Sequence, residues 1–464
     1  MNMQWRVLAL HFSFALVLFR TASAPAQNIT EFPKFQKEDR VLILAPHPDD
    51  EIIGCAGVIL HALKSGAAVK VVYLTNGDNN IFSILFSNPL LFPLRLVTLT
   101  EGAFISLGRH RQEEAIKAMA ILGIKKEDLI FLGYPDHGTD QMFVFNWNNN
   151  RPYTSMFARQ SSVPYAESRS YKKEFKGNNI LGDLKTIALD YKPTKIFVSH
   201  PADVNGDHWA LYLYLQVVLA DLLDEMPEPQ VYPYLVHILN WPRPHNYHPE
   251  LKMEPPAQKF FDDLNASVKW KQALLTPEEI EKKHEALLAY NSQTRISAFY
   301  LLSFVRQTEL FSDLPLITVK RQKSLKTPGE PDGNCAFTSD TQWVGFAVVD
   351  DCLLIKAKRP KELKVGPAYL FFIATYKFGE EFGKMPNIAI LTQYDKFRMY
   401  DTLGAKRPLD AKGTSLKLNP DSLIVKIPLS LLKDLDGFIF AFDSTGRKIV
   451  PSGCTAFRKV IIEK

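Results

Sequence analysis

The chain has 464 residues, enough for two or three domains, and its apolar fraction of 46% and charged fraction of 23% are those of a soluble globular protein. The formal net charge of +5 is small for this length, and no basic cluster alternates with aromatic residues. This composition argues against nucleic acid as a partner.

Residues 1–24 have the layout of a secretory signal peptide. Arg6 precedes an apolar run at 7–19, and small residues at 22–24 offer a cleavage site. A membrane anchor is disfavoured because the run is short for a bilayer and ends at Arg20. We therefore expect a secreted or periplasmic protein with no transmembrane segment in the mature chain.

A strand, a helix and a second strand are predicted between residues 40 and 78. The apolar run at 41–44 is bounded by a turn, a helical pattern covers 52–64, and 69–74 forms the next strand. Such a βαβ unit has parallel strands. Ligands bind outside the carboxyl ends of these strands, which is where His47, Asp49 and Asp50 fall.

The His-Pro-Asp-Asp-Glu run at 47–51 has two interpretations. Acidic residues at a helix start can cap free amides and complement the helix dipole. His47 with Asp50 is instead a normal pair of zinc ligands, which needs a third ligand from elsewhere in the chain. The histidine beside the acidic pair favours the metal site.

Residues 79–107 are apolar but are interrupted by Pro89, Pro93 and Arg95, so a membrane-spanning helix is not expected there. Two alternatives remain for this segment. It forms either a helical hairpin of ordinary core or an apolar lid beside the site, which would suit a greasy substrate.

Strands and helices continue to alternate up to about residue 310. The strand at 195–198 leads into His200 and the Asp207-His208 pair, at the same sheet edge as His47, so His208 is the candidate third ligand. A capping box is expected at Thr276. The other predicted elements are helices at 109–123, 180–189, 209–223 and 277–290, strands at 129–132 and 231–239, and a surface loop at 141–173.

The composition changes near residue 319. Residues 318–334 are charged and rich in proline and glycine, which is typical of a linker between a first domain at 38–317 and a second at 335–464. Short strands with turn residues between them predict an antiparallel β-sandwich in the second domain. We expect these strands at 343–349, 353–357, 368–375, 387–392, 422–428 and 437–443.

The chain contains four cysteines. Cys55 falls on the helix after the histidine-aspartate turn and is expected to be a buried thiol. Cys335, Cys352 and Cys454 allow at most one disulfide among them, and the sequence leaves the pairing open.

With the 47–51 motif after one strand and Asp207-His208 after another, residues 39–310 resemble the LmbE/PIG-L family of zinc-dependent de-N-acetylases. Arg111-x-x-Glu114 and the Gly-Tyr-Pro-Asp run ending at Asp136 follow in the expected order. The resemblance implies an α/β fold with a Rossmann-like parallel sheet and helices on both faces. It also implies a Zn²⁺ cofactor and removal of acetyl from glycans or glycoconjugates that contain N-acetylglucosamine.

The resemblance further implies a role for each motif residue. Zinc would be held by His47, Asp50 and His208, and Asp49 would be the base that activates the zinc-bound water. Asp207 would orient one of the ligands without touching the metal itself.

Four other residues are candidates for substrate binding. Arg111 and Asp136 match positions that bind sugar hydroxyls in the family. His237 and Trp241 could line the sugar pocket, although a buried structural histidine and a tryptophan that packs a proline-rich loop are equally consistent with the sequence.

The chain departs from the family pattern at Asn205, where family members often carry a histidine. An amide can donate a hydrogen bond to an oxyanion, but it cannot act as a general acid. The proton could return from His200, His137 or Asp49. His200 could also be a satisfied histidine at the end of its strand.

Three hypotheses for the function follow. The first is an exported zinc-dependent de-N-acetylase whose C-terminal domain binds glycan or a partner. The second is a carbohydrate-binding protein with an inactive amidase domain, for which the lost histidine is the argument. The third is an amidase that acts on another N-acyl substrate. Zinc content and acetate release would separate them.

Overall fold

The computed structural model describes residues 29–86, 99–148, 151–256, 268–314, 316–322, 333–337, 342–358, 368–393, 396–403, 407–420, 422–443 and 457–463. The expected signal peptide therefore lies outside the described residues, as do Cys454 and the side chain of Cys335. Cys55 is a buried free thiol, as predicted. None of the described helices combines the length and apolar character needed to cross a bilayer.

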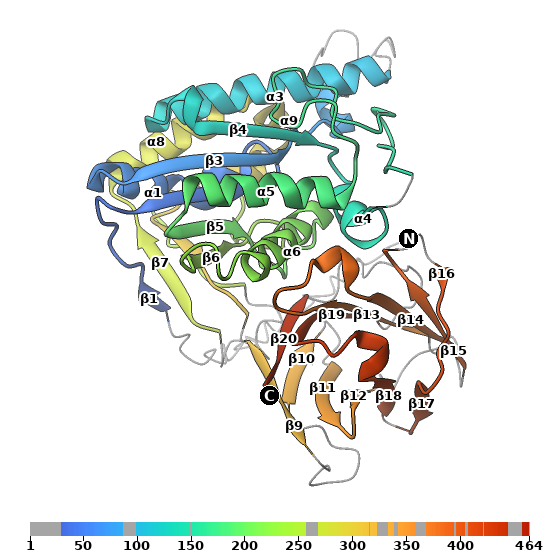
Figure 1. Cartoon of the computed structure of the whole chain (residues 1–464). Helices are drawn as coiled ribbons and strands as arrows, with labels where there is room; N and C mark the ends of the chain where they lie inside the picture. Colours follow the sequence, from blue (N-terminus) through green and yellow to red (C-terminus); the bar gives the residue numbers. More distant parts are fainter. Residues whose placement is uncertain are drawn as a thin grey trace, which may run out of the picture.

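The N-terminal part of the chain forms a mixed sheet of eight strands (Figure 1). Its order is β1-β7-β8-β6-β5-β2-β3-β4. Strands β2 to β6 run parallel, and β8 lies antiparallel to both β6 and β7. The bounds are β1 Ile29–Glu31, β2 Arg40–Ala45, β3 Ala68–Thr75, β4 Leu129–Tyr134, β5 Lys195–Ser199, β6 Gln230–Tyr234, β7 Trp270–Leu274 and β8 Thr308–Phe311.

Alternate residues of β2 build the cores on the two faces of this sheet. Val41 and Ile43 join the cluster formed with α1, α3 and α8, whereas Leu42 and Leu44 join the cluster formed with α5 and α6. This two-sided burial confirms the α/β class with helices on both faces. The helices are α1 Asp50–Ser65, α2 Ile81–Phe86, α3 Glu101–Leu122, α4 Thr139–Val144, α5 Gly177–Tyr191, α6 Gly206–Asp221, α8 Pro277–Leu288 and α9 Asn291–Leu301.

Several elements differ from the sequence predictions. The expected loop at 141–173 overlaps α4, and α9, β7 and β8 were not predicted. The strand expected at 231–239 ends at Tyr234, and the amides of Val236 and His237 beyond it donate to Asp203 Oδ2 instead of to a neighbouring strand. The capping box at Thr276 is present at the start of α8.

The topology creates one switch point in the parallel part of the sheet. β2 lies between β5 and β3, and the chain continues from β2 to β3 and β4 on one side before it crosses to β5 on the other. The loops that follow β2 and β5 therefore leave in opposite directions, and a crevice forms between them. Both predicted histidine motifs lie in these two loops.

The C-terminal part is a curled sheet of twelve strands (Figure 1). A sandwich of two separate sheets is not confirmed. β9 pairs with both β20 and β11, and so it joins the strands on its two sides into one sheet. β9 overlaps the expected linker at 318–334. The bounds are β9 Ile317–Gln322, β10 Gly333–Phe337, β11 Gln342–Val349, β12 Cys352–Lys358, β13 Ala368–Tyr376, β14 Asn387–Gln393, β15 Lys396–Asp401, β16 Arg407–Pro408, β17 Ser415–Leu418, β18 Ser422–Pro428, β19 Gly437–Asp443 and β20 Arg458–Glu463.

A buried ion pair ties α1, α8 and β8 together. Lys283 Nζ lies 2.7 Å from Glu309 Oε1 and donates to Ile53 O at 2.8 Å. Glu309 in turn accepts from the amides of Gly57 and Val58. Both charged side chains are nearly inaccessible to solvent, so the pair is stable only while each charge keeps its partner.

Replacing Lys283 with Met should lower the free energy of unfolding by about 3–5 kcal/mol, because it leaves the Glu309 carboxylate buried without its counter-charge. Urea unfolding followed by circular dichroism measures this loss. Lys282→Met is the matched control, since Lys282 is exposed on the same helix and its change should stay within about 0.5 kcal/mol. Equal stability of the two variants would contradict the structural role of the pair.

Candidate metal centre and active site

The turn between β2 and α1 brings His47 and Asp50 together. The Asp50 carboxylate accepts from the His47 amide at 3.0 Å, and the Asp50 amide donates back to His47 O at 3.3 Å. Asp49 occupies the N-cap position of α1, yet its side chain makes no capping hydrogen bond. The interpretation of the acidic run as a helix cap is therefore wrong for Asp49.

The loop after β5 delivers the second histidine. Asn205 caps α6 by accepting from the Asp207 amide at 2.9 Å, so His208 falls in the first turn of that helix. Ser199 Oγ donates to His208 O at 2.7 Å and ties this turn to the end of β5. His208 is completely buried.

Three donor atoms of these two segments converge. His47 Nδ1, His208 Nε2 and Asp50 Oδ2 lie 3.1–3.2 Å from one another. Two imidazole nitrogens and one carboxylate oxygen at such separations form a set that could hold a metal ion. This donor set is one that Zn²⁺ commonly has at catalytic sites, where three protein ligands leave one position open.

Carboxylates support both imidazoles from behind. His47 Nε2 lies 3.1 Å from Asp136 Oδ1 and 3.2 Å from Asp207 Oδ2. His208 Nδ1 lies 3.0 Å from Asp203 Oδ2. Metal-binding histidines typically direct their second ring nitrogen to a carboxylate in this way, which fixes the tautomer and the orientation of the ring.

Asp49 lies beside the three donors in an unusual backbone conformation. Its φ is 119°, in the left-handed region that residues other than glycine rarely adopt. The Glu51 carboxylate accepts from the Asp49 amide at 3.0 Å and from the Tyr290 hydroxyl. Arg111 Nη2 donates to Asp49 Oδ2 at 3.2 Å and to Pro48 O at 2.5 Å. These contacts stabilise the strained turn and direct the carboxylate into the site.

Gly77, which follows β3, makes room for this arginine. Arg111 Nη1 donates to Gly77 O at 2.9 Å, and a Cβ at position 77 would lie only 2.1 Å from the same nitrogen. Gly77 also has a φ of +61°. A larger residue would therefore displace the Arg111 guanidinium from Asp49.

Burial and neighbouring charges shift the pKa values of the site's side chains in opposite directions. Burial opposes the charged form of His47, but the Asp136 carboxylate outweighs it and holds the His47 pKa well above its ordinary value. Burial likewise opposes the charged form of Asp50, yet His208 and His47 hold its pKa well below the usual range. Burial raises the pKa of Asp49 to about 7 against the opposing charge of Arg111.

His47 and Asp50 open onto a cavity of about 380 Å³, whereas His208 is completely buried and is not among the residues that line it. His47, Asp49 and Asp50 form one part of its wall, and α2 and α9 contribute further lining residues. The further lining residues are mostly polar, with some apolar side chains: Ile53, Asn79, Asn80, Ile81, Phe82, Arg111, Asp136, His137, Asn205, His237, Gln293, Ser297, Tyr300 and Leu301.

The structure brings most predicted site residues to this cavity, but not all of them. Asp136 lines the cavity and also contacts His47, and the His237 ring lies 4.7 Å from the His208 ring. His200 is fully buried and is not among the lining residues, and its Nδ1 accepts from the Ala202 amide. Burial lowers the pKa of His200 to about 3.

Trp241 is also absent from the cavity wall. Its indole packs edge-on against Phe304 in the core, and its Nε1 donates to Glu254 O at 2.8 Å. Trp241 therefore has the packing role, which was one of the two roles that the sequence allowed for it.

Sequence reasoning missed three residues that support the site. Thr139 donates to Asp207 Oδ1 through both its amide and its hydroxyl, Asp203 lies behind His208, and Tyr290 contacts Glu51. Asp203 offered a signal, since it is an acidic residue five positions before the expected ligand. Thr139 and Tyr290 offered none.

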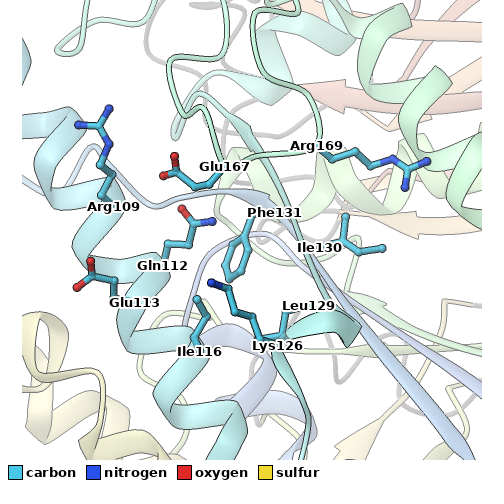
Figure 2. A pocket seen from close by; sticks show the side chains of 10 residues that line it. All are labelled: Arg109, Gln112, Glu113, Ile116, Lys126, Leu129, Ile130, Phe131, Glu167 and Arg169. Atoms are coloured by element: carbon cyan, nitrogen blue, oxygen red, sulfur yellow. The ribbon is translucent and has the colours of Figure 1, made fainter.

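A second cavity of about 550 Å³ lies between α3 and the edge strand β4 (Figure 2). Charged side chains of both signs surround an apolar floor that includes Phe131 and Ile116. It contains none of the metal-site residues, so its lining does not extend the candidate active site.

Comparison with known proteins gives one family match. Residues 42–218 match the family model described as PIG-L, GlcNAc-PI de-N-acetylase. The comparison with curated proteins gives no match.

Several solved structures are similar at low sequence identity. The conserved protein TT1542 from Thermus thermophilus is 18% identical, with a TM-score of 0.34, over 62% of this chain and 98% of that one. N,N'-diacetylchitobiose deacetylase from Pyrococcus horikoshii is 18% identical, with a TM-score of 0.32, over 59% and 82%. A deacetylase of the teicoplanin biosynthesis pathway is 15% identical, with a TM-score of 0.34, over 57% and 90%.

The matched residues include the turn that carries His47 and Asp50, the helix that carries His208, and the parallel strands between them. Residues 42–218 of this chain therefore form a domain of the PIG-L (LmbE) family of de-N-acetylases.

Proposed function

We propose that the chain is a divalent-metal-dependent de-N-acetylase that acts on N-acetylglucosamine-containing glycans or glycoconjugates, with Zn²⁺ as the metal. One observation carries the proposal: the donor atoms of His47, His208 and Asp50 lie within 3.2 Å of one another, with the Asp49 carboxylate beside them on the wall of a cavity. The family match supports the amide-hydrolysing chemistry.

The charges around the donors fit a divalent cation. Asp49, Asp50, Asp136, Asp203 and Asp207 are all buried near two imidazoles, and burying so many carboxylates is costly unless positive charge balances them. His47, Asp50 and His208 would hold the metal. When bound there, such a metal polarises a substrate carbonyl and makes water easier to deprotonate.

Residues of the chain would then supply the base, its positioning and the oxyanion donor. Asp49 accepts a proton from the attacking water, and Arg111 keeps the Asp49 carboxylate turned toward the cavity. Asn205 uses its Oδ1 to cap α6, which leaves its Nδ2 group as a donor for the oxyanion that forms on the carbonyl. After attack, the proton held by Asp49 is available for the leaving amine.

The cavity lining supports a sugar substrate. Amide and hydroxyl groups of Asn79, Asn80, Gln293 and Ser297 could bind sugar hydroxyls, and the Tyr300 and Phe82 rings offer apolar faces. The acetamide would lie at the His47 side of the cavity. Another N-acyl compound remains the alternative substrate, and a panel of N-acyl amides beside N-acetylglucosamine conjugates would identify it.

Replacing His208 or Asp50 with Ala should reduce the bound metal to a small fraction of one ion per chain, since each change removes one of three ligands. Metal content after purification, measured by plasma mass spectrometry, reports this. His237→Ala is the matched control, because the His237 ring lies beside that of His208 but His237 is outside the donor set. Unchanged metal content in the His208 variant would refute the proposed centre.

Asp49→Asn should lower kcat for acetate release from N-acetylglucosamine conjugates by about 10²- to 10⁴-fold, because the amide cannot accept the proton. The metal content should remain that of the unmodified chain. Asp140→Asn, a change of the same chemistry at a residue outside the cavity wall, should retain activity. Turnover by the Asp49→Asn variant at the rate of the unmodified chain would rule out the role of Asp49 as base.

Asn205→Asp should lower kcat by about 10²- to 10³-fold, because it removes the Nδ2 donor while it keeps an oxygen to cap α6. Asn205→Ser, which also caps helices well, should behave alike and so separates loss of the donor from the added charge. Steady-state kinetics together with thermal unfolding measure both effects. Full activity in both variants would exclude Asn205 from oxyanion stabilisation.

A further inference from the structure

The curled C-terminal sheet lies against the side of the first domain that carries α4 and α6 (Figure 1). Side chains of the two parts share one buried cluster, in which Trp147, Trp209 and Tyr214 of the first domain meet Phe382 and Phe457 of the second. The two parts are therefore joined through a common core.

The first contact between the two parts involves Trp147, in the segment that follows α4. The Phe382 ring lies 4.9 Å from the Trp147 ring, and a Cβ at Gly383 would come within 2.8 Å of Trp147 Nε1. Trp147 stacks on Tyr214 at 5.9 Å, and the Tyr214 hydroxyl donates to Thr139 O at 3.3 Å. The position of Thr139 thus depends on aromatic groups that the C-terminal part holds in place.

Thr139 is hydrogen-bonded to a carboxylate that contacts the candidate metal site. Its amide and its hydroxyl donate to Asp207 Oδ1 at 3.0 and 2.5 Å. Asp207 Oδ2 accepts from the His137 amide at 2.6 Å and lies 3.2 Å from His47 Nε2. Movement of the Thr139 segment would therefore shift the carboxylate that orients His47.

The second contact falls on the helix of the other histidine. Phe457 stacks on Trp209 with ring centres 4.4 Å apart, and Trp209 directly follows His208. Lys459 Nζ also donates to Gln216 Oε1 at 3.4 Å, farther along α6. The C-terminal part therefore contacts both segments that support the metal ligands.

We propose that the C-terminal sheet is a positioning element of the metal site, and that Phe382 and Phe457 are its positioning residues. This inference rests on the proposed metal centre. It differs from the view of the sheet as a separable glycan-binding module, in which loss of these contacts would leave metal binding unchanged.

The test uses the full chain with Phe382→Ala and Phe457→Ala. Phe346→Ala is the matched control, since it removes an equally buried phenyl ring from the core of the curled sheet, away from the shared cluster. The melting temperature of each variant is measured first, and all comparisons are made at a temperature where every variant is folded.

Hydrogen exchange of the metal-free protein is the first readout. We expect faster exchange in peptides that cover 136–147 and 205–212 in the two interface variants, and unchanged exchange there in the Phe346 variant. The second readout is Zn²⁺ affinity, measured by competition with a chelator. We expect about tenfold weaker Zn²⁺ binding in the two interface variants only. Phe382→Leu, which retains much of the apolar contact, should recover most of the affinity.

Unchanged exchange in the interface variants would overturn the inference, as would an equal loss of Zn²⁺ affinity in the Phe346 variant. If the unmodified chain binds no Zn²⁺, the proposed function fails, and the exchange data from metal-free protein still decide whether the sheet positions the two segments. The two failures are therefore distinguishable.

Discussion

The geometry of the candidate centre depends on the carboxylates behind its two imidazole rings. His47 is held from behind by Asp136 and Asp207, and His208 by Asp203. Each supporting carboxylate is buried, so each must be satisfied by hydrogen bonds or by positive charge. Backbone amides and Thr139 supply many of these hydrogen bonds, and the free sides of both rings are left facing one another. A cation among the donor atoms would offset the repulsion between these buried carboxylates.

The sheet topology explains how residues about 160 positions apart in the chain meet. His47 follows β2, and His208 follows β5, which is the neighbour of β2 on the other side from β3. Parallel strands end at one edge, so the two loops leave from adjacent points. The C-terminal part packs against α6, the helix that carries His208 in its first turn. The same helix therefore carries a candidate metal ligand in its first turn and, one residue later, the tryptophan that stacks on Phe457.

Much of the first domain could be predicted because its strands and helices follow strong local patterns. The alternation in β2 and the 47–51 motif are contained in short stretches of sequence. β8 was missed because it carries a buried charge, Glu309, whose partner lies on α8. The role of Thr139 depends on a contact 68 positions away, which no local pattern reveals. His200 follows its strand at the expected edge, but its ring turns back to its own loop, a choice decided by the Ala202 amide rather than by strand periodicity.

The left-handed backbone at Asp49 has an evolutionary consequence. Glycine adopts this conformation freely, whereas a residue with a Cβ, aspartate included, is strained in it. The mutations that relax the turn are thus those that delete its carboxylate. Selection for a robust fold and selection for turnover would act against each other at this single codon.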